Sequence, residues 1–334
     1  MKRSLCLLLA LLPIGWAADP PAPPTQLDPM KVTASSPLLK VAEFHLRTPR
    51  FGAAVAAHGD YLYILGGSSA DDWVLDTIER LDVRTGVTEP FGRLQRGRLW
   101  HRVVSVGMNL LVLGGDTVFA GTNGRMTLRT EDSVERIDLA TGRATFGPPL
   151  PQPRRSFACS TAGGYVFVFG GYWRADNQAG WSNAAWRLDL ATLRWEVLPP
   201  KPTPCEAEAA LVHGPLFLLP GGFDGVKAIR EVEMFNPRDN TWRTLPALCR
   251  PASAHAVAFL GHHLFLFGHY DDIGQCLAYD LRTRQSEVIA APFTGARHAA
   301  AVVHRDRIYI VGGRTADSSV GLDLVQVFAL RSSR

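Results

Sequence analysis

The chain has 334 residues, of which 46% are hydrophobic and 20% are charged, and its formal net charge at pH 7 is +4. This composition is typical of a folded globular protein and excludes a disordered, low-hydrophobicity chain. A net charge so close to zero over this length gives no electrostatic basis for binding nucleic acid or an anionic membrane. We therefore expect neither as a partner.

The first 17 residues have the pattern of a secretory signal peptide. Lys2-Arg3 precede a short apolar stretch, and small residues stand at Gly15 and Ala17, where a signal peptidase would cut. The apolar stretch is too short to span a membrane, so we expect no stable membrane insertion after cleavage. Loss of Lys2 and Arg3 lowers the net charge from +4 to +2. These features predict an exported protein of bacterial type, periplasmic or extracellular.

Residues 18–37 are rich in proline and begin with the run DPPAPP at Asp19–Pro24. Such a composition is typical of a flexible linker. We expect this segment to be a flexible leader and residues 38–334 to form one folded domain.

A glycine pair that closes an apolar run recurs along the rest of the chain about every fifty residues. Examples are YLYILGG at Tyr61–Gly67 and YVFVFGG at Tyr165–Gly171, and in the fifth copy a histidine, His269, replaces the second glycine. The first glycines of the copies are Gly66, Gly114, Gly170, Gly221, Gly268 and Gly312. This period is typical of an array of propeller blades.

Each copy contains four short segments with turn signals between them. A small apolar segment comes first, then the run into the glycine pair, then a segment such as ERLDVRTG at Glu79–Gly86, and last a segment that ends in proline. The aspartate before the turn suits an Asx turn, and Gly86 supplies a positive φ. Four short strands per copy predict one antiparallel blade each.

The fourth copy resembles the kelch motif most closely. Phe223-Asp224-Gly225 follow its glycine pair, and Glu233–Asn236 and Trp242 come next. The chain is therefore similar to kelch-repeat β-propellers, the family that includes the central domain of galactose oxidase, from about Val41 to Leu330. The resemblance implies an all-β, six-bladed propeller.

The two ends of this array are complementary. The sixth copy stops at its third segment, Val325–Leu330, whereas a spare strand-like segment, Leu38–Leu46, precedes the first copy. We predict that the N-terminal strand completes the last blade, which removes open sheet edges.

Four cysteines lie beyond the signal peptide. Cys205 and Cys249 occupy corresponding turns of adjacent copies, and an oxidising compartment permits pairing, so we predict a Cys205–Cys249 disulfide. Cys159 and Cys276 fall within strands and are expected to be buried thiols. The spacing of the cysteines and histidines matches no zinc pattern, and we expect no metal and no cofactor.

Strand alternation places the start of each innermost strand and the loop after each glycine pair on one face, which we call the loop face. That face is predicted to bind a ligand through arginines around the channel mouth and through loop aromatics. The predicted ligand-binding residues are Arg50, Arg98, Arg154, Arg297, Trp73, Trp173 and Trp181. The alternative is that the arginines bond to carbonyls and acids of adjacent blades and have a structural role.

Two function classes remain open. The first is a non-catalytic exported module that binds a protein or glycan partner through the loop face. The second is a carbohydrate-active enzyme similar to the periplasmic kelch sialic-acid mutarotase, with Glu206, Glu208 or His101 as the catalytic candidates. A galactose-oxidase-like copper enzyme is disfavoured, because no convincing ligand set is present. We favour the non-catalytic module.

Overall fold

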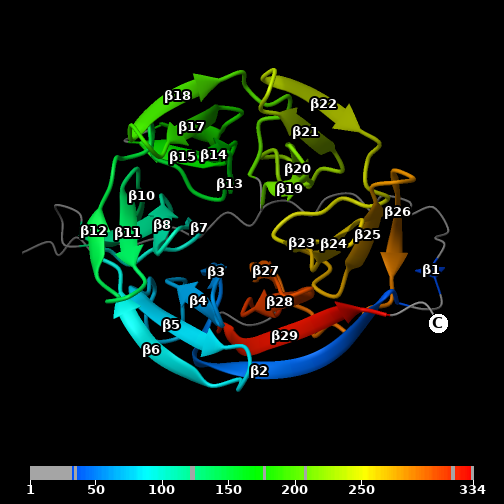
Figure 1. The fold of residues 1–334 in the computed structure, drawn as a ribbon, viewed down its shortest axis with the longest axis horizontal. Coiled ribbons are helices and arrows are strands. Elements are labelled where there is room, and N and C mark those ends of the chain that lie inside the picture. The colour runs from blue at the N-terminus through cyan, green and yellow to red at the C-terminus, as the bar shows by residue number, and fades with distance from the viewer. Residues whose placement is uncertain are drawn as a thin grey trace, which may run out of the picture. The chain divides into compact units, whose positions relative to one another are not determined.

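The computed structural model describes residues 32–33, 36–120, 125–175, 178–206, 209–316 and 320–331. From Val32 onward these residues form an all-β propeller of six blades (Figure 1). The predicted signal peptide, most of the predicted leader and Glu208 lie outside the described residues. Within them, no helix has the length and apolarity needed to cross a membrane.

Blades 1 to 3 each contain an antiparallel sheet of four strands, numbered from the axis outward. Blades 2 and 3 also carry a two-stranded hairpin on the loop after the glycine pair. Blade 1 has β3 (Ala54–His58), β4 (Tyr61–Leu65), β5 (Thr77–Asp82) and β6 (Thr88–Arg93). Blade 2 has β7 (Arg102–Val106), β8 (Asn109–Leu113), β11 (Val134–Asp138) and β12 (Ala144–Phe146), with hairpin β9 (Asp116–Ala120) and β10 (Met126–Thr130). Blade 3 has β13 (Ala158–Ala162), β14 (Tyr165–Phe169), β17 (Ala185–Asp189) and β18 (Arg194–Leu198), with hairpin β15 (Tyr172–Ala175) and β16 (Gln178–Trp181).

Blades 4 to 6 repeat the same order, with additions from the N-terminal end of the chain in blades 5 and 6. Blade 4 has β19 (Leu211–His213), β20 (Leu216–Pro220), β21 (Val232–Asn236) and β22 (Thr241–Leu245). Blade 5 has β23 (Ala256–Leu260), β24 (His263–Phe267), β25 (Cys276–Asp280), β26 (Gln285–Ile289) and β1 (Val32–Thr33). Blade 6 has β27 (Ala300–His304), β28 (Arg307–Val311), β29 (Leu322–Leu330) and β2 (Leu38–Arg50).

The predicted closure is confirmed. Strand β2 pairs antiparallel with β29, from Leu38 opposite Leu330 to Arg50 opposite Leu322, and it lies outermost in blade 6 (Figure 1). Leu38 is fully buried in the core between blades 5 and 6. The strand before the first repeat therefore joins the two ends of the array.

The prediction that all of residues 18–37 form a flexible leader is wrong for residues 32–33. These two residues form β1, which pairs in parallel with β26 opposite Val288 and Ile289. Ser36 is also buried, and its hydroxyl accepts a hydrogen bond from the backbone N–H of Leu38 at 3.0 Å. Pairing covers the outer edge of blade 5, which would otherwise present unpaired backbone groups.

The hydrophobic core lies between neighbouring blades. Phe167 and Phe169 of β14 pack against Phe217 of β20 and Phe235 of β21, with the Phe167 and Phe217 ring centroids 4.6 Å apart. The apolar run into each glycine pair thus supplies the side chains that join one blade to the next.

Backbone hydrogen bonds also link the blades close to the axis, just before each innermost strand. Four such bonds, 2.8–3.0 Å long, run from blade 5 through blades 6, 1 and 2 to blade 3. The donor N–H groups and acceptor carbonyls are His298 to Ala254, Gly52 to His298, Trp100 to Gly52, and Ser156 to Trp100. All five residues have φ between 47° and 62°. For the four non-glycine residues this conformation is uncommon, and the hydrogen bonds hold it in place. The residues that flank them at the loop-face opening are therefore rigidly positioned.

Candidate binding site at the loop face

Arg50 and Arg98 are internal braces and not ligand-binding residues of the channel mouth, which corrects the prediction. Both side chains are fully buried. Arg98 donates to the Glu135 carboxylate at 2.8 Å and to the Gly114 carbonyl at 2.7 Å. Arg50 contacts Glu79 and the Gly66 carbonyl in the same way, at 2.5 and 2.9 Å. Each pair ties the linker before a blade to the second and third strands of that blade.

Arg154 has the corresponding position in blade 3 and is also buried away from the mouth, but no ion pair joins it to an acid of the described residues. Its guanidinium carbon lies 4.5 Å from the ring centroid of Trp186, which stands where Glu135 stands in blade 2. Burial lowers the pKa of Arg154 to about 10. In blade 4 the arginine position is Cys205, and the buried Lys201, four residues earlier, supplies the cation that pairs with Glu233 at 2.8 Å.

Arg297 occupies a different position from the other three predicted arginines. Counting sixteen residues back from the first glycine gives Arg50, Arg98 and Arg154, but gives Ala296 in blade 6. Arg297 therefore corresponds to Arg155, the next residue in blade 3. Because neighbouring residues of an extended segment point to opposite sides, this single step turns the side chain from the blade interior to the mouth.

Arg155, Arg297 and Arg314 form the charged part of the opening, which we call the mouth. Backbone bridges join Arg155 to Tyr172 and Arg297 to Arg314. The Arg155 guanidinium carbon lies 4.5 Å from the ring centroids of both Trp100 and Tyr172. Arg155 also faces two acids, Asp116 and Glu206, each at 3.4 Å.

Arg297 and Arg314 differ from Arg155 because, among the described residues, neither forms an ion pair with an acid. Arg297 lies 4.2 Å from the Tyr270 ring centroid and donates to the Tyr270 carbonyl at 2.9 Å. Arg314 lies 4.7 Å from the Phe51 ring centroid. Burial, with the adjacent Arg297, lowers the pKa of Arg314. Two adjacent guanidinium groups that form no ion pair within the described part of the chain favour an anion at this place.

The three predicted tryptophans lie in different places relative to the mouth. Trp181 lies beside the mouth, partly exposed, with its ring centroid 5.4 Å from that of Tyr172 and 5.9 Å from that of Phe223. Trp173 follows Tyr172 on β15, so its side chain points to the other side of the hairpin. Trp73 is 51% exposed, and no ring contact among the described residues joins it to the mouth.

A cavity of about 120 Å³ lies on the axis among the innermost strands. Its lining includes Trp100, Arg102, Cys159 and His298. Burial and the surrounding arginines lower the pKa of His298 to about 3, and burial raises the pKa of Cys159 to about 12, so both side chains are neutral at pH 7. The cavity is far smaller than the usual site for a small organic ligand, which favours binding at the mouth above it.

Among the described residues, the predicted catalytic candidates His101 and Glu206 lie apart, His101 in the blade interior and Glu206 at the mouth. His101 is completely buried, packs against Gly66 and Gly115, and neither ring nitrogen has a hydrogen-bond partner among the described residues. Burial and neighbouring arginines lower its pKa well below the ordinary value. His101 is therefore a packing residue. Glu206 reaches the mouth, and Glu208 lies outside the described residues.

The predicted Cys205–Cys249 disulfide is not formed, because both thiols are free. Cys205 is buried in the core between blades 3 and 4, where Lys201 Nζ lies 3.1 Å from its sulfur. Cys249 packs in the next core and accepts a hydrogen bond from Ser286 Oγ at 3.4 Å. Each sulfur thus packs in a different blade junction.

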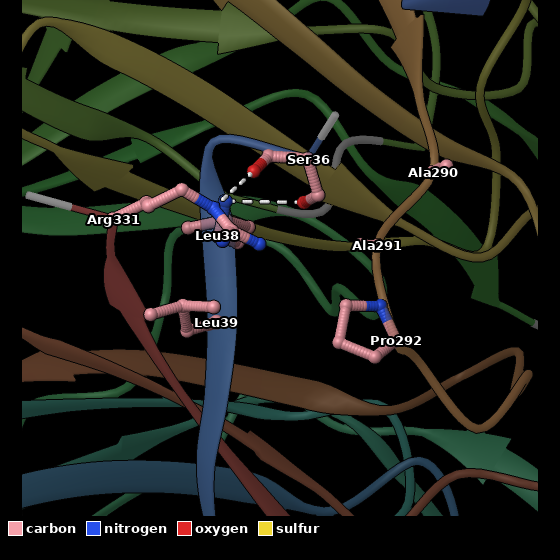
Figure 2. Close-up of a pocket in the computed structure, with 7 residues that line it drawn as sticks. All are labelled: Ser36, Leu38, Leu39, Ala290, Ala291, Pro292 and Arg331. Atoms are coloured by element: carbon pink, nitrogen blue, oxygen red, sulfur yellow. Dashed lines mark hydrogen bonds between the residues drawn. The ribbon is translucent and has the colours of Figure 1, made fainter. Parts of the chain in front are cut away.

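A larger hollow of about 500 Å³ lies at the outer edge, where β2 begins (Figure 2). Its lining is apolar except for Ser36 and Arg331, and Arg331 Nε donates to the Ser36 carbonyl at 3.2 Å. No group of convergent polar side chains lines it, so the mouth remains the candidate site.

The model of the KLHDC2/KLHL20/DRC7 Kelch-repeats domain matches residues 52–269 of the chain. The chain belongs to this kelch-repeat family. Kelch propellers serve as protein-binding modules, and this fold is consistent with that role. The solved structure of YjhT superposes on this kelch propeller with a TM-score of 0.71 and 14% identity, over 84% of this chain and 95% of that one.

Curated relatives carry kelch names as well. The chain is 28% identical to Kelch domain-containing protein 10 homolog of Drosophila melanogaster, over 61% of this chain and 36% of the relative. It is 23% identical to Kelch-like protein 38 of Rattus norvegicus, over 79% of this chain and 44% of the relative. Kelch domain-containing protein 10 of Xenopus tropicalis is 26% identical, over 84% of this chain and 76% of the relative. The chain thus spans less than half the length of the first two relatives.

Three mouth residues of this kelch propeller, Arg155, Arg314 and Tyr270, are not among the predicted ligand-binding residues, although the loops that begin at Tyr270 and Arg314 were expected on the loop face. Arg314 and Tyr270 stand directly after the glycine pair or its equivalent in their blades. Aligning the residue after each glycine pair would have found Ser68, Asp116, Tyr172, Phe223, Tyr270 and Arg314. That alignment was the available signal.

Proposed function

We propose that this kelch propeller is an exported, non-catalytic module that binds an acidic segment of a protein partner at the mouth. Arg297 and Arg314 would receive carboxylates of the partner, and the ring of Tyr270 together with Trp181 would pack against its apolar atoms. The observation that carries the proposal is the adjacent pair Arg297 and Arg314 without an acid among the described residues.

Physical chemistry favours a carboxylate at this place. A guanidinium group presents several N–H donors in a plane that matches two carboxylate oxygens. A hydrogen bond to a charged group contributes about 1.5–3 kcal/mol, so two such contacts support micromolar binding together with modest apolar contacts. The rigid opening lowers the entropic cost of binding.

A peptide array that samples acidic, neutral and basic sequences tests the proposal. The wild-type protein should retain acidic peptides selectively, and the R297A/R314A variant should lose them. Arg238 is exposed in a turn at the opposite end of blade 4, so R238A changes charge without touching the mouth. Equal retention by R297A/R314A and wild type would contradict the proposal, as would selective retention of basic peptides.

A second candidate is an exported sugar mutarotase that acts on an acidic sugar. One observation favours it: Glu206 lies 3.4 Å from Arg155 at the mouth, so a carboxylate that can transfer protons stands beside a cation that binds anions. The rate at which the anomers of sialic acid interconvert, followed by NMR, should then rise with the protein and fall to the spontaneous rate with E206Q. No acceleration by the wild-type protein would exclude this candidate.

A further inference from the structure

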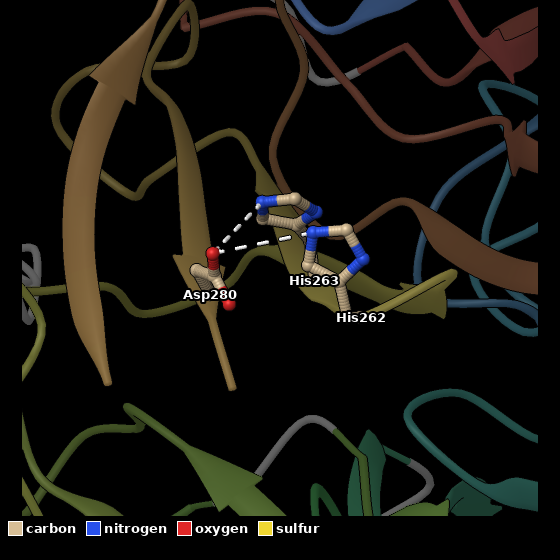
Figure 3. Close-up of side chains that lie close together, drawn as sticks. All are labelled: His262, His263 and Asp280. Carbon is tan, nitrogen blue, oxygen red and sulfur yellow. Dashed lines mark ion pairs between the residues drawn. The ribbon is translucent and has the colours of Figure 1, made fainter. Parts of the chain in front are cut away.

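His262, His263 and Asp280 bring three metal-binding atoms together at the end of blade 5 opposite the mouth. His263 starts β24 and pairs directly with Asp280, the last residue of β25. His262 Nε2 lies 4.0 Å and His263 Nε2 3.9 Å from the same oxygen, Asp280 Oδ2 (Figure 3). All three ligand atoms lie within 4.8 Å of one another.

We propose that these three side chains form a binding site for a divalent first-row transition metal ion such as Zn²⁺. Two imidazoles and one carboxylate form a donor set that suits zinc and its neighbours, whereas Mg²⁺ and Ca²⁺ prefer oxygen ligands alone. Metal–nitrogen and metal–oxygen bonds of about 2.0–2.2 Å draw ligand atoms closer together than they are here, so the side chains need to rotate slightly. Each is partly exposed and has room to do so.

The carboxylate is already oriented for this role. Asp280 Oδ1 accepts hydrogen bonds from the backbone N–H groups of Arg282 and Thr283, at 2.7 and 3.4 Å. These bonds occupy one oxygen in the turn and leave Oδ2 facing the two histidines. Outer hydrogen bonds of this kind hold ligand groups in place and raise metal affinity.

Arg282 shows that a cation is favoured at this place. Its Nη2 lies 2.5 Å from His262 Nε2 and 3.6 Å from Asp280 Oδ2, so it contacts two of the three ligand atoms. A guanidinium can only donate, so the Nε2 lone pair of His262 points toward the site. The Arg282 side chain is 68% exposed and can swing into solvent when a metal ion takes its place.

The site is specific to blade 5. In blade 1 the residues that correspond to His262 and His263 are Asp60 and Tyr61, and in blade 2 they are Met108 and Asn109. An aspartate stands at the Asp280 position of both blades, where its Oδ1 also accepts backbone hydrogen bonds in the turn. The aspartate is thus a recurring turn residue, and the histidine pair is what blade 5 adds.

Isothermal titration of the chain with ZnCl₂, with MgCl₂ as the comparison, tests the proposal. We expect one saturable Zn²⁺ site per chain and no comparable Mg²⁺ site. H262A and H263A should each weaken Zn²⁺ binding by at least about tenfold. R282A should tighten it, because a competing cation is removed. His45, whose Nδ1 lies 3.0 Å from Asp323, forms a two-ligand pair only, and H45A should leave the affinity unchanged.

Two results would overturn the proposal. One is the absence of saturable Zn²⁺ binding to the wild-type chain and to R282A. The other is Zn²⁺ binding that H262A and H263A leave unchanged. Circular dichroism of each variant distinguishes loss of the site from loss of the fold.

Discussion

Replacing Arg98 by methionine should destabilise the propeller much more than the same change at Arg154. Both side chains are fully buried and occupy the same place in adjacent blades. Arg98 neutralises Glu135, which is itself fully buried, whereas Arg154 faces the ring of Trp186. Loss of Arg98 therefore leaves an uncompensated carboxylate in the core, and loss of Arg154 leaves no charge.

The magnitudes follow from that difference. Removing one partner of a buried ion pair costs about 3–5 kcal/mol. Removing Arg154 loses a cation–π contact and two hydrogen bonds, at 3.3 Å to Gly170 O and 2.8 Å to Gln152 Oε1, but it also ends the burial of an unpaired cation. We expect a net cost of about 1–2 kcal/mol for R154M.

Blade 6 provides a natural design for rescue. Ala296 and Gln326 stand there in place of Arg98 and Glu135, and Gln326 Oε1 accepts the Thr294 N–H at 2.7 Å, as Glu135 Oε2 accepts the Gln95 N–H at the same distance. The double variant R98M/E135Q recreates this neutral arrangement. It should recover most of the stability that R98M loses.

Urea unfolding followed by the fluorescence of the eight tryptophans measures these differences through the midpoint and the slope of the transition. Equal destabilisation by R98M and R154M would refute the reasoning. So would a double variant that is no more stable than R98M.

Three further outcomes are expected. L38A should lower the unfolding free energy by about 2–5 kcal/mol, because Leu38 is fully buried in the closing strand. V41A, at an exposed position of the same strand, should change it by less than about 0.5 kcal/mol, and similar values for the two variants would contradict the closure. His255 is 1% exposed, and burial lowers its pKa to about 3, so below about pH 6.5 the unfolded chain binds a proton that the folded chain does not. The unfolding free energy should therefore decrease as the pH is lowered from about 6.5 towards 3, by up to about 1.4 kcal/mol per pH unit, and H255L should reduce that slope. Thiol titration of a chain that starts at residue 18, unfolded without reductant, should find that all four cysteines react: Cys159, Cys205, Cys249 and Cys276. A count of only two reactive thiols would indicate that a disulfide is present.

The blades and their closure could be predicted from the sequence because they depend on local signals that repeat six times. Each apolar run ends at its glycine pair, or at Gly268 in the fifth copy, and the aspartates at Asp82, Asp138 and Asp280 form the expected turns with backbone N–H groups. The spare segment Leu38–Leu46 has no place in any other blade. The repeat pattern and the number of strand-like segments were together sufficient to predict the blades and their closure.

The roles of the arginines could not be predicted in this way, because a single residue step decides which side of the backbone each faces. Arg154 and Arg155 are adjacent, and only an exact count back from the first glycine of each blade shows that Arg155, and not Arg154, corresponds to Arg297. The partner types do covary along the repeats: Arg with Glu in blades 1 and 2, and Ala296 with Gln326 in blade 6. That covariation supports a structural role for the buried arginines, and a comparison of the six repeats would have revealed it.

The histidine–aspartate cluster was missed for a different reason. The two adjacent histidines precede the aspartate by 18 and 17 residues, and only the register of β24 against β25 places His263 opposite Asp280. A search based on cysteine and histidine spacing does not include strand register.

Hydrogen–deuterium exchange of the propeller, with and without an acidic peptide selected on the array, tests most directly that the loop-face mouth is the binding site. Binding there predicts slower exchange in the segments that carry the mouth residues, 98–101, 154–156, 268–274, 296–298 and 313–316, and none of this slowing in the R297A/R314A variant. Slower exchange confined to the turns at the opposite ends of the strands, such as 82–88 and 236–241, would contradict it.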